Sequence, residues 1–280
     1  MLLSPYGGPG MQLAVRAHGW WSAVAQWFAE QGFAVLIADG RGTPGRGRDW
    51  EVAVRGDRLG PALEDQVDAL HAAAVRYPAL DLGRVAVRGW SYGGYLAIGA
   101  VLDRPDVFHA AVAGGAPTDR RLYDTHWEER FLGHPDVEPG NYERSSLVGR
   151  AHRLTRPLML VHGLADDNVV AAHTLRLSAA LLAAGRPHTA LPLPGATHLV
   201  TREEVVANQL RLEAEFLRRS LGGDRRGAPP RRGPTWPHGA GAGPAPAVGR
   251  PRPPRAGGGG GRSVSPRRRR RPRAGPPPPP

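Results

Sequence analysis

Short apolar runs alternate with amphipathic stretches along the first 220 or so residues. Apolar runs that fit buried strands cover residues 2–3, 33–38, 85–87, 109–115, 157–163 and 189–193. Between them, helices are predicted at 19–29, 62–77, 96–102 and 203–217. The chain is therefore predicted to alternate strands with helices. The helix 203–217 is expected to close the domain by docking on a sheet through Val206, Leu210 and Leu217.

Two of these segments carry details that affect their placement. The helix 19–29 spaces its aromatic residues, among them Trp20, Trp27 and Phe28, at helical intervals, so this aromatic stripe is expected in the core. The strand 189–193 contains Pro192, which cannot donate a ladder hydrogen bond. A weak strand is predicted there.

Composition divides the chain at residue 222. From there on it has 14 arginines and one acidic residue, whereas the first 221 residues carry 23 arginines and 24 acidic residues. The segment 222–280 is rich in Pro, Gly and Ala with almost nothing apolar to bury, which predicts a disordered tail. Its Arg-rich run could attract nucleic acid, but no aromatic residue is interleaved with that run for base stacking, so a nucleic-acid partner is not expected. A solvated tail and out-of-frame coding sequence remain alternatives.

Several kinds of chemistry are excluded by what the sequence lacks. Without cysteine, the chain can form no disulfide, thiolate nucleophile or cysteine-based zinc site. No histidine has metal-ligand spacing with a second ligand, so no metal and no cofactor is implied. No apolar run approaches the roughly 20 residues that span a bilayer, and the first residues do not resemble a signal peptide. A cytoplasmic location is therefore expected, and oligomeric state is not predicted.

A possible nucleophile follows the strand 85–87. Gly89-Trp90-Ser91-Tyr92-Gly93 has the pattern G-x-S-x-G and leads directly into the helix 96–102. Between a strand and a helix this pattern is a nucleophile elbow, in which glycines without a Cβ permit a tight, strained turn that exposes the serine hydroxyl. The backbone N–H of Tyr92 would then donate to a developing oxyanion.

An acid and a histidine follow in the chain order that such an elbow requires. The strand 157–163 leads into Asp166-Asp167-Asn168, and the strand 189–193 leads into a loop of small residues that carries His198. A histidine can take the serine proton while a carboxylate orients its ring. Spacing alone does not separate Asp166 from Asp167.

The combined motifs resemble the hydrolase domain of the prolyl oligopeptidase family of serine peptidases, nearest its dipeptidyl peptidase IV branch. The resemblance covers residues 1 to about 220 in family order, through Tyr6-Gly7-Gly8-Pro9, Asp39-Gly40-Arg41-Gly42, Gly89 to Gly94, His162 to Val169, and His198. It implies an α/β-hydrolase fold, with a mostly parallel sheet flanked by helices. It also implies a serine peptidase that cleaves peptides through an acyl-enzyme, releasing dipeptides after Pro or Ala. An acylaminoacyl peptidase, an oligopeptidase or an esterase on the same fold, an inactive fragment, and a tail-driven nucleic-acid binder remain alternatives.

The resemblance also assigns roles to single residues. Ser91, Asp166 and His198 would form the catalytic triad, Asp166 because the family's acid is the first of the pair. The phenol of Tyr6 would join the Tyr92 amide as the second oxyanion donor. The substrate would be held by four further residues: Tyr123, Trp127, Asn168 and Val169. Trp127 departs from the branch, which usually has tyrosine there, and its wider indole is expected to narrow the pocket.

Parts of the family's architecture are missing from the sequence. The family places a β-propeller ahead of this domain, and no repeat of propeller length occurs here. The first strands of the hydrolase sheet also have no counterpart, and residues 2–3 would lie centrally in it. A partial catalytic domain at 1–221, belonging to a longer protein, is therefore expected.

Overall fold

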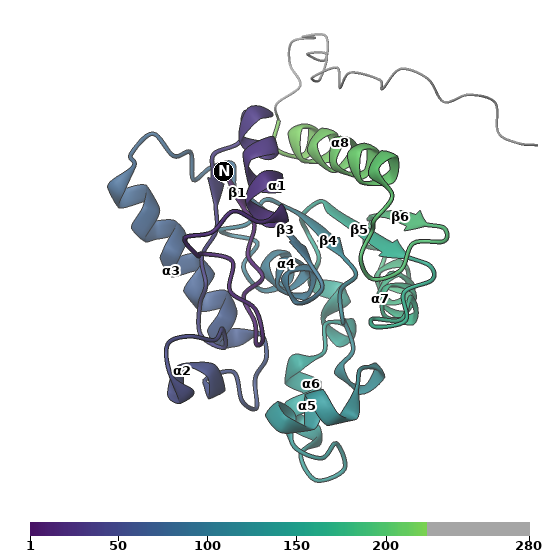
Figure 1. Ribbon diagram of the computed structural model, residues 1–280. Coiled ribbons are helices and arrows are strands. Elements are labelled where there is room, and N and C mark those ends of the chain that lie inside the picture. The colour runs from purple at the N-terminus through teal and green to yellow at the C-terminus, as the bar shows by residue number, and fades with distance from the viewer. Residues whose placement is uncertain (223–280) are drawn as a thin grey trace, which may run out of the picture. The chain divides into compact units, whose positions relative to one another are not determined.

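A sheet of six parallel strands organises the computed structural model, which describes residues 1–222. The strand order is β2-β1-β3-β4-β5-β6 (Figure 1). The bounds are β1 Leu2–Leu3, β2 Val35–Leu36, β3 Ala86–Trp90, β4 Ala110–Gly114, β5 Leu158–Gly163 and β6 Thr189–Leu193. The predictions for the tail fall on residues 223–280, which lie outside the described part of the chain.

Helices connect successive strands, as the parallel arrangement requires. Their bounds are α1 Trp20–Glu30, α2 Arg48–Val52, α3 Gly60–Arg76, α4 Tyr92–Asp103, α5 Thr125–Leu132, α6 Pro139–Ser145, α7 Ala172–Ala183 and α8 Glu203–Ser220, with short 3₁₀ helices at Arg120–Leu122 and Val148–Arg153. The helices α5 and α6 lie together below the sheet in Figure 1, within the long connection from β4 to β5.

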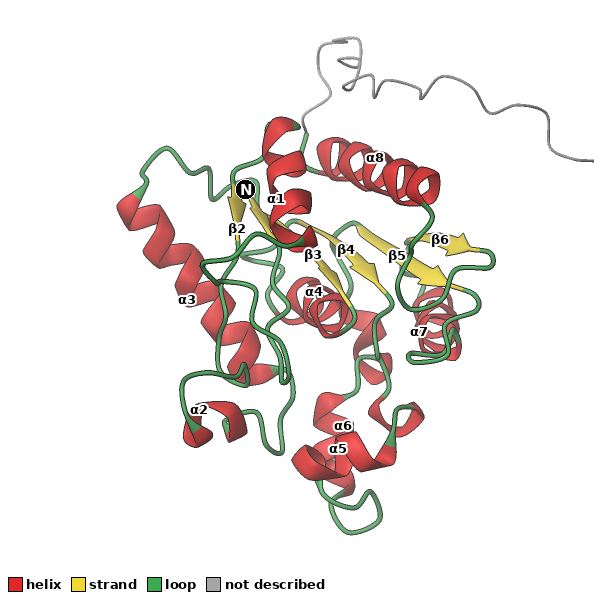
Figure 2. Ribbon diagram, in the orientation of Figure 1, coloured by secondary structure: helices red, strands yellow, loops and turns green. Residues whose placement is uncertain are grey.

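The central strands β1, β3, β4 and β5 are buried on both faces, and their consecutive residues contribute to opposite layers of the core. Leu3 packs in the layer formed with α3, α4 and α7, whereas Leu2 packs in the layer formed with α1 and α8. Figure 2 shows these two groups of helices on opposite sides of the sheet. Because strand side chains point alternately to the two faces, a strand that is covered on both faces, such as β4, is apolar throughout rather than alternating.

The helix α1 and the two edge strands, β2 and β6, differ in detail from the elements that the sequence predicts. Phe28 is buried, but Trp20 is 58% exposed, so the prediction that the whole aromatic stripe of α1 lies in the core is wrong. Helical spacing places residues on one face but does not say how much of that face a neighbour covers.

The strand predicted at 33–38 is reduced to the two half-buried residues of β2 at the sheet edge. Pro192 lies in β6 at the opposite edge, where its missing N–H costs no ladder hydrogen bond.

Candidate active site

The predicted nucleophile occupies a strained turn between β3 and α4. Ser91 has φ of 57° and ψ of −119°, and it is the only non-glycine residue with positive φ among residues 1–222. Its backbone N–H donates to the carbonyl of Gly114 at 2.8 Å, and its carbonyl accepts from the N–H of Tyr95 at 3.0 Å. Such a conformation costs on the order of 1–3 kcal/mol and persists only where the surroundings hold it. The elbow is therefore a locked feature of the fold.

The glycines of the elbow are needed because other backbone segments pass too close for a Cβ. The positive φ of the turn is at Ser91, not at the glycines. A Cβ added to Gly89 would lie 2.1 Å from the carbonyl carbon of Gly93. A Cβ on Gly93 would lie 2.3 Å from the carbonyl oxygen of Pro5. Neither glycine has a positive φ. The Gly93 contact presses the segment that carries Tyr6 against the first turn of α4.

The turn after β5 holds a buried carboxylate against the histidine of the turn after β6. His198 Nδ1 donates to Asp166 Oδ2 at 2.8 Å, and the Asp166 side chain is fully buried. Asp166 Oδ1 accepts from the backbone N–H groups of Asn168 at 3.0 Å and Val169 at 2.8 Å. Asp167 is exposed. Of the two carboxylates that spacing left equivalent, Asp166 is the one that contacts the imidazole.

His198 lies beside the elbow, and both are at the carboxyl ends of the strands. Trp90 Nε1, one residue before the nucleophile, donates to the His198 carbonyl at 2.8 Å. A Cβ added to Gly115 would lie 3.3 Å from His198 Cε1, and Gly115 follows the residue that accepts from the Ser91 N–H. No hydrogen bond joins the Ser91 hydroxyl to the His198 ring in the described residues. Such bonds are often long without substrate and tighten when it binds.

The two predicted oxyanion donors flank Ser91. Tyr6 is half-buried, and its ring centroid lies 6.0 Å from that of Tyr92. Burial raises the pKa of the Tyr6 phenol, the phenols of Tyr123 and Tyr92 raise it further, and the Ser91 side chain lowers it. The phenol is therefore protonated at neutral pH and can donate. The Tyr92 side chain is buried, with its hydroxyl on the Arg58 carbonyl, so its contribution to the site is the free N–H at the start of α4.

The four predicted substrate-binding residues lie around the start of α5 and in the turn after β5. The Tyr123 hydroxyl donates to Asn168 Oδ1 at 2.9 Å, and burial raises the pKa of that phenol. Val169 is fully buried behind them. Trp127 is half-buried, with its ring 5.8 Å from the ring of Phe131. A Cβ added to Gly10 would lie 3.4 Å from Trp127 Cη2, so the indole reaches the loop that carries Tyr6.

One residue that supports the site was not predicted to do so. His162, to which the sequence assigned no catalytic or metal-binding role, is buried behind Asp166. Its Nε2 donates to the Val169 carbonyl at 2.7 Å and lies 3.6 Å from Asp166 Oδ2, while its Nδ1 accepts from Thr174 at 2.7 Å. Burial lowers the pKa of His162, so the ring is neutral and holds the turn by hydrogen bonds rather than by charge. Its position at the end of a buried strand, four residues before the acid, was the available signal.

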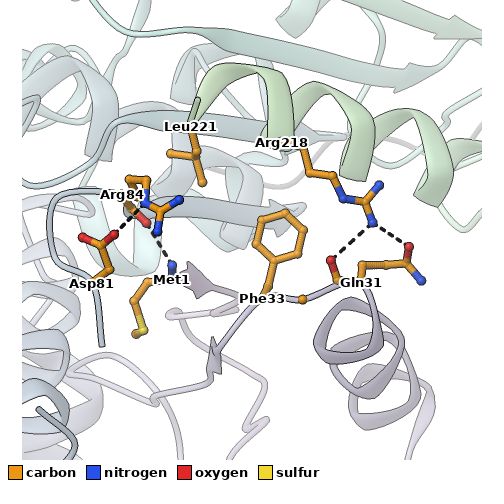
Figure 3. Close-up of a pocket in the computed structure, with 8 residues that line it drawn as sticks. Met1, Gln31, Phe33, Asp81, Arg84, Arg218 and Leu221 are labelled. Carbon is orange, nitrogen blue, oxygen red and sulfur yellow. Dashed lines mark hydrogen bonds and ion pairs between the residues drawn. The ribbon is translucent and has the colours of Figure 1, made fainter. Parts of the chain in front are cut away.

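A hollow of about 230 Å³ lies away from these residues (Figure 3). The residues that line it come from the segments just before β1, β2 and β3 and from the end of α8. The hollow therefore lies at the amino ends of these strands. Its polar groups are paired with one another: Arg84 with Asp81, the Met1 ammonium with the Arg84 carbonyl, and Arg218 with Gln31. Ligands of parallel sheets bind at the carboxyl ends, where Ser91, Asp166 and His198 lie.

Two further properties of the described residues concern metal binding and membrane insertion. The part of the chain that the structure describes holds no cluster of three or more potential metal ligands. Among the helices of residues 1–222, none combines the length and hydropathy that crossing a bilayer requires.

Comparisons with known proteins identify relatives of this chain and agree with its fold. The model of the prolyl oligopeptidase family matches residues 20–224. Human dipeptidyl peptidase 8 is 38% identical over 199 residues, which are 70% of this chain and 22% of that protein. Probable dipeptidyl-aminopeptidase B of Coccidioides posadasii is 36% identical over 182 residues, 63% of this chain and 19% of that protein. The chain thus spans about a fifth of the length of these relatives.

A solved structure resembles the fold closely. The crystal structure of Porphyromonas gingivalis dipeptidyl peptidase 4 superimposes with a TM-score of 0.71 and 29% sequence identity, covering 77% of this chain and 30% of that one. The predicted α/β-hydrolase fold, a parallel sheet with helices on both faces, is confirmed for the described residues. With a family model that matches most of its length, the chain belongs to the prolyl oligopeptidase family.

Proposed function

We propose that residues 1–221 form the catalytic domain of a serine peptidase that cleaves peptides through an acyl-enzyme. The observation that carries the proposal is the strained Ser91 at the start of α4. It lies at the carboxyl ends of the strands, as does the Asp166–His198 hydrogen bond. Strain of this kind is retained at sites where a hydroxyl must project from the backbone. Family membership supports the same chemistry.

In the proposed mechanism, neutral His198 accepts the proton of Ser91 as the hydroxyl oxygen attacks the peptide carbonyl. Asp166 holds the imidazole by its Nδ1 proton and stabilises the cation that forms. The carbonyl oxygen becomes negative and accepts hydrogen bonds from the Tyr92 N–H and the Tyr6 phenol. His198 then protonates the leaving amine, and a water molecule releases the acyl group by the same steps in reverse.

We further propose that the substrate class is a peptide with a free amino terminus and Pro or Ala as its second residue. Tyr123, Trp127 and buried Val169 offer an apolar wall for that residue, and Asn168 offers an amide for a substrate carbonyl. The names of the relatives, dipeptidyl peptidases and a dipeptidyl-aminopeptidase, support this choice over an acylaminoacyl peptidase.

A fluorophosphonate probe tests the proposed chemistry on the chain itself. The probe reacts with an activated serine, and mass spectrometry of the digested adduct is expected to find it on the peptide that contains Ser91. Boiled protein is the control for nonspecific reaction. Dipeptide nitroanilides with a free amino group are then expected to be cleaved faster than their N-acetylated forms. A folded chain that does not react would contradict the assignment, and preference for the acetylated substrates would favour an acylaminoacyl peptidase.

Replacement of Trp127 tests the proposed pocket. Trp127→Ala removes the flat wall that a proline ring contacts, so kcat/KM for a proline dipeptide is expected to fall about tenfold or more, with a smaller loss for alanine. Trp127→Tyr should retain the preference for proline and accept larger second residues. Trp20→Ala is the matched control, because Trp20 is largely exposed on α1. Equal losses for proline and alanine in Trp127→Ala would show that the indole does not contact that residue.

A further inference from the structure

Three charged side chains are buried beneath the predicted oxyanion donors. Arg58, Arg120 and Glu128 are each exposed by 2% or less. Arg120 Nη1 pairs with Glu128 Oε1 at 3.0 Å, and Arg58 Nη1 lies 3.8 Å from Glu128 Oε2. Two cations therefore share one anion, and the cluster carries an excess of one positive charge in a region from which water is excluded.

Arg58 is the member of this cluster whose side chain makes no hydrogen bond to the described residues. None of its three guanidinium nitrogens makes a hydrogen bond within the described residues. The group lies 4.2 Å over the ring of Phe131 and 5.1 Å from the ring of Tyr92. A buried cation in this state destabilises the fold relative to an apolar side chain of similar size, and buried polar groups without partners are rare. Packing alone therefore does not explain an arginine here.

The position of Arg58 connects it to the site by two routes. Its backbone carbonyl accepts from the Tyr92 hydroxyl, and its charge lies against the Tyr92 ring, whose centroid is 6.0 Å from that of Tyr6. Burial raises the pKa of the Tyr6 phenol, and the positive charge of Arg58 opposes that rise. A phenol with a lower pKa is the stronger hydrogen-bond donor, and buried charge acts strongly across short distances.

We propose that Arg58 is a positioning residue for oxyanion stabilisation. Its buried guanidinium places positive charge behind Tyr6 and Tyr92, so that the Tyr6 phenol donates a stronger hydrogen bond to the carbonyl oxygen as that oxygen becomes negative. Arg120 pairs with Glu128 and holds it in place, and the carboxylate of Glu128 limits the net charge of the cluster. The inference rests on the proposed function for its catalytic consequence, whereas its effect on the phenol is a property of the folded chain.

Two measurements on Arg58→Met and Arg58→Lys test this role. Alkaline titration by tyrosinate absorbance, taken as the difference between each protein and its Tyr6→Phe counterpart, reports the pKa of Tyr6. That pKa is expected to be higher in Arg58→Met than in the wild type and near the wild-type value in Arg58→Lys, which keeps the charge. Labelling of Ser91 by a fluorophosphonate is expected to slow about tenfold in Arg58→Met, less than the loss from removing a whole oxyanion donor. In a Tyr6→Phe background, Arg58→Met should slow labelling much less.

Thermal unfolding identifies variants that fold, and a second variant covers the case in which Arg58→Met does not. Glu128→Gln keeps the shape of the side chain and removes the negative charge, so the pKa of Tyr6 should fall. An unchanged pKa of Tyr6 in folded Arg58→Met, or in Glu128→Gln, overturns the inference. Equal slowing by Arg58→Met with and without the Tyr6 phenol overturns it as well. A wild-type chain that does not react contradicts the proposed function, while the titration still decides the inference.

Discussion

Ser91→Ala is expected to abolish fluorophosphonate labelling and to lower kcat for a dipeptide nitroanilide by about 10⁶-fold. Removal of the nucleophile from a serine hydrolase leaves only the catalysis that binding and the oxyanion donors provide, which is the basis of this magnitude. Stopped assays at high protein concentration measure the residual rate. Residual activity within about tenfold of the wild type would mean that another residue attacks the carbonyl.

The same position allows a test of stored strain by stability. Alanine keeps the cost of φ at 57°, whereas glycine adopts positive φ without it. Ser91→Gly should therefore be as inactive as Ser91→Ala but more stable by about 1 kcal/mol after the extra chain entropy of glycine is counted, a rise in Tm of about 2–4 °C for a domain of this size. An equal or lower Tm for the glycine variant would show that the turn is not strained.

Asp166→Asn is expected to lower kcat about 10⁴-fold while the fold is retained. The amide can replace the carboxylate in shape, but its NH₂ group would face His198 Nδ1 and favour the tautomer that cannot accept the Ser91 proton. The charged form of the ring also loses its counter-ion. Measurements of kcat with a dipeptide nitroanilide and of Tm by calorimetry separate this catalytic loss from unfolding.

Asp167→Asn is the matched control for this prediction. Asp167 is the exposed neighbour of Asp166, and the same chemical change there should alter kcat by less than about twofold. If the two variants lost activity equally, the acid would not be assigned by the contact with His198. A large loss at Asp167 alone would place the catalytic acid one residue further along the chain.

The order of the strands and the candidates Ser91 and His198 could be predicted from the sequence, because both depend on local pattern. Apolar runs indicated the strands, and the G-x-S-x-G pattern placed Ser91 between a strand and a helix. The choice of Asp166 needed family resemblance, because two adjacent carboxylates have the same spacing. In the structure, burial and a hydrogen bond to His198 distinguish Asp166 from Asp167.

Features that depend on contacts distant in sequence could not be predicted in this way. Arg58 lies in a polar stretch with glycine and aspartate beside it, which is typical of a surface loop, yet it is fully buried. Its burial follows from the packing of Phe131 and Tyr92, which come from two other segments. Trp20 shows the reverse: its spacing indicated the core, but the first turn of α1 leaves it exposed.

The contact between Gly93 and the Pro5 carbonyl has a consequence for protein engineering. Tyr6 directly follows Pro5, and Tyr92 directly precedes Gly93. The Tyr6 phenol and the Tyr92 N–H, which would hold the oxyanion, therefore belong to the two segments that meet at this contact. A side chain at position 93 would displace both at once. Directed evolution for new acyl donors would therefore gain little from randomising that glycine, and more from the pocket wall at Tyr123 and Trp127, which takes no part in that backbone contact.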